Sequence, residues 1–401
     1  MKKRILLLGG IRYLLPVIKA AHEQGYYVIT ADYLPNNIAH KYSDEYVNVS
    51  IVDKEAVWKV AEEKRIDGIV SFGVDPGVVS AAYVAERMGL AFQCSYESAC
   101  ILQDKSRFRQ FLSEHGFNTP KAKGYDSIDE AVKDTDYFTW PVIVKPVDSA
   151  GSKGVTKVER KSELSSAIEN ALSSSISKRF IIEDFLDVLG YQSSADVFAV
   201  DGKLVHTSFS DQLFDKKAAN PYTPAIEIWP SSMPMSAQKE LSKELQRLIT
   251  LLKIRSGIFN VESRLCSNGK TYLMEVSPRG GGNRIAELQA LATGQDLIGN
   301  EVRQAMGEPV EGISTPVYDG VWCNYILHSD REGQLKSIDI EPHFKNAVVK
   351  DEGYSVVKGD RIVPFTGANT SLGTLFLRTN TRNEMDEILT RMDEYVSIEL
   401  E

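Results

Sequence analysis

The sequence predicts an α/β protein in which a parallel sheet is followed by mixed α+β units. Apolar runs of strand length alternate with helix-length stretches near the amino terminus, and a glycine loop and an acidic hairpin follow later in the chain. The 401 residues suggest two to four domains, at roughly 100 to 200 residues each. With 43% hydrophobic residues, the chain can build several cores.

The amino-terminal part is predicted to repeat a strand–helix unit three times. Strands are expected at 5–8, 27–31 and 68–72, and helices at 13–24, at 54–64 and after Pro76. Strands that alternate with helices pair in parallel, so this part predicts a parallel sheet. A further helix from Lys105 to His115 should end at Gly116, before a joint at 118–120.

The next feature is a buried strand that delivers a lysine beside a glycine loop. The run 142–146 is apolar apart from Lys145, whose ammonium can meet phosphate oxygens as a compact point charge. Gly151 and Gly154 allow backbone N–H groups to turn toward an anion, with Ser152 and Lys153 between them. We expect a phosphate-binding loop. It is not a P-loop, because the glycine spacing and the Gly-Lys-Ser/Thr ending are absent.

Two acidic residues are then predicted to meet across a hairpin. Strands at 257–262 and 271–275, joined by a turn at 267–269, bring Glu262 and Glu275 onto neighbouring strands. The two carboxylates repel each other, and a divalent cation would relieve the repulsion. Mg²⁺ is usually held by one or two carboxylates together with substrate phosphates. Solvent-facing strand residues are the alternative interpretation, since strand faces alternate.

The segment after the second acid is rich in donors. Arg279 offers a planar fork for a phosphate or a carboxylate. The glycine-rich run that follows exposes backbone to a second ligand, with Gly281, Gly282 and Arg284 as substrate candidates. A plain flexible loop, and a structural ion pair for Arg284, are the alternatives.

In their order along the chain, these features resemble the ATP-grasp superfamily, which includes carboxylate–amine ligases, biotin carboxylase and carbamoyl phosphate synthetase. The resemblance covers nearly the whole length and implies that the amino-terminal unit is a Rossmann-like domain preceding the ATP-grasp fold. It implies a hinge at 182–186 that reads adenine, Glu262 and Glu275 as metal ligands, and Arg279 and Lys153 as catalytic cations. The nucleotide-binding residues that it implies are Lys105, Lys145, Gly151, Ser152, Lys153, Gly154, Glu183, Asp184, Leu186 and Gln192.

Two positions depart from the family pattern. Ser277 stands where many members have an asparagine that ligates a further metal, and this weakens a second metal's ligand set. Gln192 stands where glutamate is usual, and the resemblance implies a ribose contact at this position.

The resemblance also implies four domains. These are a Rossmann-like domain at 1–118, a mobile lid at 119–185, a subdomain with the metal acids at 186–310, and a β-rich domain at 311–401. A helix is expected at 237–252. In the last domain we expect turns at 331–333, 351–353 and 358–360 and a polar helix at 383–395.

The implied activity uses ATP with Mg²⁺, or alternatively Mn²⁺, to convert a carboxylate to an acylphosphate that an amine then attacks. The glycine-rich run at 280–284 resembles amino-acid and dipeptide ligases, which favours an amino acid or a related small acid as substrate. A purine-pathway enzyme, such as the formate-using glycinamide ribonucleotide transformylase or a carboxylase-like relative, is second. That transformylase shares the Glu-Val-Ser-Pro-Arg run of 275–279. A nucleotide-binding protein without turnover is third.

Composition bears on partners and location. A net charge of −9 argues against nucleic acid or an anionic membrane as the main partner. No apolar run approaches the roughly 18 residues that span a bilayer. The four cysteines show neither zinc-ligand spacing nor a disulfide framework, so we expect a cytoplasmic enzyme with small-molecule substrates. A homodimer is left open.

Overall fold

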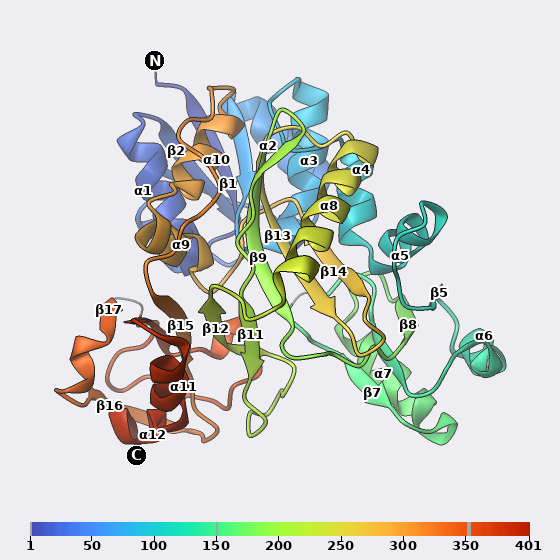
Figure 1. The fold of residues 1–401 in the computed structure, drawn as a ribbon. Coiled ribbons are helices and arrows are strands. Elements are labelled where there is room, and N and C mark those ends of the chain that lie inside the picture. Colours follow the sequence, from blue (N-terminus) through green and yellow to red (C-terminus); the bar gives the residue numbers. More distant parts are fainter. Residues whose placement is uncertain (1, 150, 351–353) are drawn as a thin grey trace.

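The computed structural model describes residues 2–149, 151–350 and 354–401, which form five sheets (Figure 1). The turn expected at 351–353 lies outside these residues. None of the described helices is long and apolar enough to cross a bilayer. The architecture is the mixed α/β arrangement that the sequence predicts, with a parallel sheet first and antiparallel sheets after it.

The first sheet is parallel throughout, as expected. Across the sheet its strands are β3 (Glu45–Asn48), β2 (Tyr27–Asp32), β1 (Arg4–Leu8) and β4 (Gly68–Ser71). Its helices are α1 (Leu15–Glu23), α2 (Lys54–Lys64) and α3 (Val78–Met88), followed by α4 (Tyr96–Gln103) and α5 (Lys105–Glu114). The sequence analysis missed β3 and α4. Strand β3 is short and only half-buried at the sheet edge, which removes the apolar pattern that identifies a strand.

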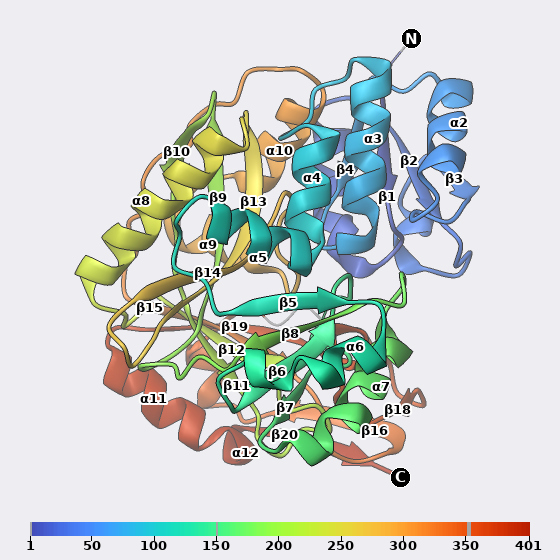
Figure 2. The same ribbon diagram turned by 90° about the vertical axis from the view of Figure 1, so that its right-hand side faces the viewer.

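A four-stranded antiparallel sheet with its own core follows. Its strands in spatial order are β5 (Ala122–Tyr125), β8 (Phe180–Asp184), β6 (Val142–Pro146) and β7 (Thr156–Val158). Its helices are α6 (Ile128–Lys133) and α7 (Leu164–Ser174). A separate hydrophobic cluster lies between this sheet and its helices. The unit projects beside α5 in Figure 2.

The central sheet is antiparallel and carries the acidic hairpin. Its strands are β10 (Lys203–His206), β9 (Ser193–Val200), β13 (Gly257–Leu265) and β14 (Thr271–Ser277). Helix α8 (Met235–Leu251) packs on it, and α9 (Ile285–Thr293) and α10 (Leu297–Ala305) follow the hairpin. The predicted pairing is confirmed, because Glu262 is the register partner of Glu275.

The carboxyl-terminal part contains two sheets. The larger is β11 (Asp211–Phe214), β12 (Pro224–Trp229), β15 (Val321–Leu327), β19 (Gly373–Thr379) and β17 (Val348–Lys350). The smaller is β18 (Arg361–Ile362), β16 (Gly333–Ile340) and β20 (Val396–Leu400). Strands β11 and β12 come from the chain before residue 311, so residues 311–401 form the smaller sheet alone but not the larger one.

The last helical stretch differs from its prediction. The single helix expected at 383–395 is two helices, α11 (Arg382–Thr390) and α12 (Met392–Tyr395), interrupted at Arg391, whose φ of −117° is not helical. Short 3₁₀ turns complete the described elements: η1 (Arg12–Leu14), η2 (Ile38–Lys41), η3 (Asp75–Gly77), η4 (Thr135–Tyr137), η5 (Lys161–Glu163), η6 (Phe344–Asn346) and η7 (Ala368–Thr370).

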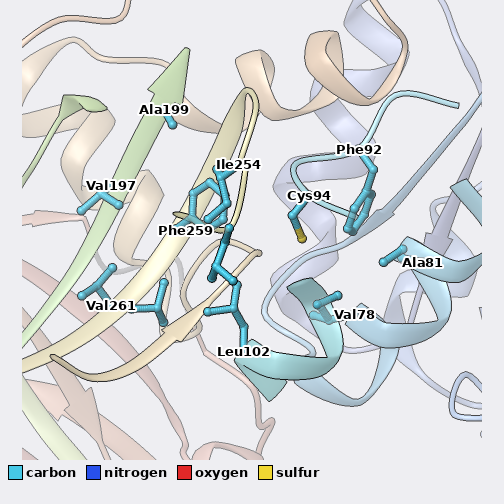
Figure 3. Close-up of a cluster of buried hydrophobic side chains, with 14 of the residues drawn as sticks. Val78, Ala81, Phe92, Cys94, Leu102, Val197, Ala199, Ile254, Phe259 and Val261 are labelled. Carbon is cyan, nitrogen blue, oxygen red and sulfur yellow. The ribbon is translucent and has the colours of Figure 1, made fainter. Parts of the chain in front are cut away.

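One hydrophobic core joins the first unit to the central sheet. Figure 3 shows Val78 of α3 and Leu102 of α4 on one side, and Val197 of β9 and Phe259 of β13 on the other. All four belong to one cluster of buried side chains. Because close-packed interiors deform little, this core fixes the end of β4 relative to the acidic hairpin.

Candidate nucleotide and substrate site

Lys105 links the acidic hairpin to the segment that leads into the glycine loop. It begins α5, and the preceding Asp104 caps this helix by accepting hydrogen bonds from the next backbone N–H groups. Its Nζ lies 3.3 Å from Glu275 Oε2 and donates to the carbonyl of Ser149 at 3.1 Å. Burial alone would lower the pKa of Lys105, but the charge of Glu275 outweighs it and raises the pKa. Lys105 is therefore a half-buried, protonated cation at this site.

The two hairpin acids have the chemistry of a cation site. Burial first, and then the charge of Glu275, raise the pKa of Glu262. A divalent cation between paired carboxylates would relieve both effects. The described residues contain no group of three acidic, histidine or cysteine side chains arranged for a metal. The two glutamates would thus hold Mg²⁺ only together with ligand oxygens, which is the usual arrangement for this ion.

Three charged side chains meet where β6, β8 and α5 converge. Lys145 Nζ donates to Glu183 Oε2 at 3.0 Å, and Arg109 Nε lies 3.0 Å from Glu183 Oε1. Burial would raise the pKa of Glu183, but the two cations hold it at about 2. Burial lowers the pKa of Lys145 to about 8, and nearby Arg109 adds to this while Glu183 opposes it. Among the described residues, neither terminal nitrogen of Arg109 has a hydrogen-bond partner.

The glycine loop requires its glycines. Gly151, Ser152 and Gly154 have φ values of 69°, 56° and 71°, a region that side chains disfavour. A Cβ on Gly154 would also lie 2.9 Å from the Cβ of Ser174. Lys153 is exposed between them. The loop also contacts the segment that connects β11 to β12. Asn220 of this segment donates through Nδ2 to the Ser152 carbonyl at 3.4 Å.

The remaining hinge residues are held by protein contacts. Asp184 Oδ1 accepts from the backbone of Thr139 at 2.9 Å, and Leu186 packs against a small hydrophobic cluster. The amide of Gln192 donates to Gln212 at 2.7 Å and accepts from Arg264 at 2.8 Å. A ribose contact by Gln192 would compete with both bonds, so this geometry gives it no support.

Arg279 is anchored to the first unit. Its Nε and Nη2 donate to the two oxygens of Asp75 at 2.8 and 2.7 Å, and Nη1 donates to the Gly280 carbonyl at 3.0 Å. Ser277 donates to Asp75 at 2.9 Å and accepts from Gln103 at 2.7 Å. We expected the guanidinium of Arg279 to face a phosphate, but it faces Asp75. Each of its two terminal nitrogens keeps one N–H that can still donate to a ligand. The Ser277 hydroxyl is likewise engaged by protein.

Hydrogen bonds to Asp196 hold the glycine-rich turn at 280–284 in place. Both oxygens of Asp196 accept from the Gly281 N–H, at 2.8 and 3.1 Å, and Asn260 Nδ2 donates to the same carboxylate at 3.0 Å. A Cβ on Gly280 would lie 2.2 Å from the ring of Phe72. This close packing argues against the alternative of a plain flexible loop. A Cβ on Gly282 would still lie 3.3 Å from the ring of Tyr13.

Arg284 forms a bidentate ion pair. Its Nε and Nη2 donate to Glu287 at 2.8 and 2.9 Å, and Nη1 donates to Thr374 at 3.3 Å. The fork proposed as a substrate clamp is therefore occupied by Glu287 in this structure. The structural ion pair, which was the alternative interpretation, describes this geometry.

Comparison with known proteins supports the resemblance. Residues 138–287 match the family model described as an ATP-grasp domain. The chain is 24% identical over 333 residues to the carbamoyl phosphate synthase large chain, C-terminal section, of Aquifex aeolicus, covering 80% of this chain and 61% of that one. It spans only 24% of the Thermotoga neapolitana carbamoyl phosphate synthase large chain.

Another relative matches over nearly its full length. The formate-dependent phosphoribosylglycinamide formyltransferase of Bacteroides thetaiotaomicron is 24% identical over 394 residues, covering 96% of both chains. Among solved structures, the L-amino acid ligase from Bacillus licheniformis has a TM-score of 0.82 at 20% identity, covering 100% of this chain and 99% of that one. The phosphoribosylglycinamide synthetase from Anaerococcus prevotii has a TM-score of 0.78 at 20% identity, covering 100% of both. The protein has the ATP-grasp fold.

The candidate site contains residues that the sequence analysis did not predict. Arg109 follows Lys105 by one helical turn, and this i,i+4 spacing was a usable signal. Asp75 follows β4 at the carboxyl end of the parallel sheet, where α/β proteins place ligand residues. Asp196 and Asn260 are register partners on β9 and β13, and nothing in their local sequence indicates it.

Lys145 and Glu183 contact each other directly. The sequence analysis gives Lys145 a phosphate role and places Glu183 in the hinge that reads adenine. The two side chains form one buried ion pair, because β6 pairs directly with β8. A change at Lys145 must therefore also affect Glu183.

The ATP affinity should depend on pH through Lys145. Its pKa is lowered from 10.5 to about 8, so the ammonium is present below pH 8 and is lost above it. We expect ATP affinity to be level up to about pH 8 and then to fall by up to about tenfold per pH unit. Calorimetry with MgATP on both sides of pH 8 measures this. Lys145→Arg stays charged and should remove the decline; an unchanged decline in that variant would contradict the assignment.

Proposed function

We propose that the protein is an ATP- and Mg²⁺-dependent ligase that joins a small carboxylate, an amino acid or a related acid, to an amine through an acylphosphate. The observation that carries the proposal is the position of Lys105, which contacts the metal-type acid Glu275 and the segment before the glycine loop. Phosphate oxygens placed between the loop and the acids would meet both the ammonium and the metal.

Each group of residues has a part in this proposal. Lys105, Lys145 and Lys153 would bind the phosphates of ATP, and Glu262 and Glu275 would hold Mg²⁺, which neutralises charge on the transferring phosphoryl group. The segment 183–186 would hold the adenine. The glycine-rich turn, fixed by Asp196, would form the floor of the second substrate site.

The reaction proceeds in two displacements. A substrate carboxylate oxygen forms a bond to the γ-phosphorus as the bond to ADP breaks. The amine then attacks the acyl carbon, phosphate leaves, and the amine loses a proton. Carboxylate and phosphate repel each other, so positioning and charge neutralisation by these cations supply the catalysis rather than a protein nucleophile. The proteins named among the relatives and similar structures include an amino acid ligase and a formate-dependent formyltransferase.

The second candidate is a formate-using enzyme of purine synthesis. The Bacteroides relative named for such an activity matches over 96% of both chains. The glycine-rich turn at 280–284 favours the amino-acid type, because the purine branch continues with a Pro-His pair there. The four cysteines are free, which suits a reducing cytoplasm as the site of action.

A screen of phosphate release tests the proposal. MgATP is offered with pooled amino acids and other small carboxylates, with formate plus glycinamide ribonucleotide, and with pooled amines, each alone and in combination. The proposal expects release only when a carboxylate and an amine are both present, and the pooled amino acids supply both groups by themselves. Release with formate and the ribonucleotide alone supports the second candidate. Binding of MgATP without release in any combination would indicate a nucleotide-binding protein without turnover.

A further inference from the structure

A row of buried polar side chains crosses the larger carboxyl-terminal sheet toward the glycine-rich turn. Gln212 of β11 is the register partner of Glu227 on β12, and Glu227 is the partner of Asn324 on β15. Register partners on antiparallel strands have their side chains on the same face. The three are 3%, 1% and 0% exposed. Together they form a continuous polar row. The sequence does not indicate this row, because its members lie on three separate strands.

The row faces the substrate side of the proposed site. Asn324 Nδ2 donates to the carbonyl of Asn283 in the glycine-rich turn. The Tyr13 hydroxyl donates to Asn283 Oδ1 at 2.8 Å, so the first unit closes the same region. The guanidinium of Arg284 lies 4.7 Å above the ring of Phe376, which is the register partner of Asn324 on the next strand.

Two acceptors in this row lack donors. Glu227 Oε1 accepts from Gln212 Nε2 at 3.2 Å, but among the described residues no donor with hydrogen-bond geometry reaches Glu227 Oε2 or Asn324 Oδ1. A contact from the Ser194 hydroxyl also lowers the pKa of Glu227. Buried acceptors without donors are costly, and such groups in a folded protein call for an explanation.

The negative charges near Glu227 favour the binding of a cation there. Burial first, and then the negative charges of Asp196 and Glu262, raise the pKa of Glu227 to about 8, while the hydrogen bond from Gln212 opposes them. The free carboxyl is therefore largely protonated at neutral pH, and a positive ligand would take the place of that proton. A metal fits less well here than at the acidic hairpin, because the row of Gln212, Glu227 and Asn324 supplies one carboxylate rather than two. A primary ammonium carries three N–H donors, enough for both free acceptors.

We propose that Glu227 Oε2 and Asn324 Oδ1 bind a primary ammonium group of a substrate. The proposal rests on the ligase function proposed above and narrows its substrate class. The ammonium belongs either to the α-amino group of the acyl donor or to the amine of the other substrate, which must lose a proton before it attacks. In the first case the acyl donor is an amino acid rather than a simple acid such as formate, and in the second case the acyl donor is not restricted.

Glu227→Gln tests the site, because it keeps the size of the side chain but cannot carry the negative charge that would pair with an ammonium. We expect the KM of the ammonium substrate to rise by at least about tenfold, with the KM of ATP unchanged, as for a lost ground-state contact. Phosphate release from MgATP is measured with amino acids as probes. Glu387→Gln, an exposed position on α11, is the control and should match the wild type. Unchanged KM values for every substrate of a folded Glu227→Gln protein would overturn the proposal.

Substrate analogues test the same site in the wild type, even if the variant does not fold. Each accepted amino acid is compared with its desamino acid, and each amine with hydroxylamine, which is mostly uncharged at neutral pH. Loss of activity with the desamino acid assigns the site to the acyl donor, and loss with hydroxylamine assigns it to the nucleophile. Full activity with both analogues would refute the ammonium site while leaving the ligase function intact. A wild type that releases no phosphate with any pair would instead refute the ligase function, and the ammonium proposal with it.

Discussion

Glu275→Gln is expected to lower turnover by at least about a hundredfold while the protein remains folded, because the loss of one electrostatic stabiliser at a reaction centre typically costs 10²–10³ in rate. Glu275 is the register partner of Glu262 and contacts Lys105 at 3.3 Å. The amide keeps the shape of the side chain but cannot neutralise a metal. It also leaves Lys105 without its closest carboxylate.

The measurement is phosphate release under saturating MgATP, with circular dichroism to confirm folding. Glu240→Gln on α8 is the matched control, since this glutamate is exposed on a helix that packs on β14. It should retain wild-type turnover. If a folded Glu275→Gln protein releases phosphate at a near-normal rate, Glu275 does not hold the metal.

Asp75→Asn should destabilise the protein strongly. Asp75 holds Arg279 through two bonds, and the pKa of Asp75 is lowered because the charge of Arg279 outweighs the effect of burial. Removing one partner of a buried pair leaves an uncompensated charge, at a cost of about 3–5 kcal/mol. Urea unfolding should therefore show a loss of that size, and stability should be partly restored in Asp75→Asn/Arg279→Met, which lacks both charges.

Asp319→Asn supplies the comparison for this prediction. Asp319 pairs with Arg378 at 2.8 Å, but its side chain is 92% exposed. Exposed pairs contribute about 0–1 kcal/mol, so this variant should unfold almost like the wild type. Equal losses in the Asp75 and Asp319 variants would mean that the Asp75–Arg279 pair does not fasten the first unit to the site.

The sequence predicted the local parts of the site and missed the contacts between distant segments. The Glu262–Glu275 pairing was predictable because a hairpin joins residues that are near in sequence. The Lys145–Glu183 pair forms because β6 lies beside β8 rather than β5. Hydrophobic periodicity predicts strands but not their order in a sheet, so the sequence did not indicate this pair. The Asp75–Arg279 pair joins residues 204 positions apart in the chain.

The same limit explains the two arginine expectations. The sequence placed Arg279 and Arg284 beside a glycine-rich turn, and the structure places them there. It could not show that Asp75 and Glu287 occupy their forks, because a side chain's partner depends on packing rather than on residue type. The row of Gln212, Glu227 and Asn324 was hidden for a related reason: each member is one polar residue in an apolar strand, and only the sheet brings them together.

The most direct test of the proposed chemistry follows oxygen atoms. An accepted carboxylate substrate is labelled with ¹⁸O in both oxygens and incubated with MgATP and the amine in unlabelled water. Formation of an acylphosphate transfers one carboxylate oxygen to the released phosphate, so the account predicts one ¹⁸O per phosphate by mass spectrometry. Phosphate that carries no label, released alongside an amide product, would contradict the acylphosphate route.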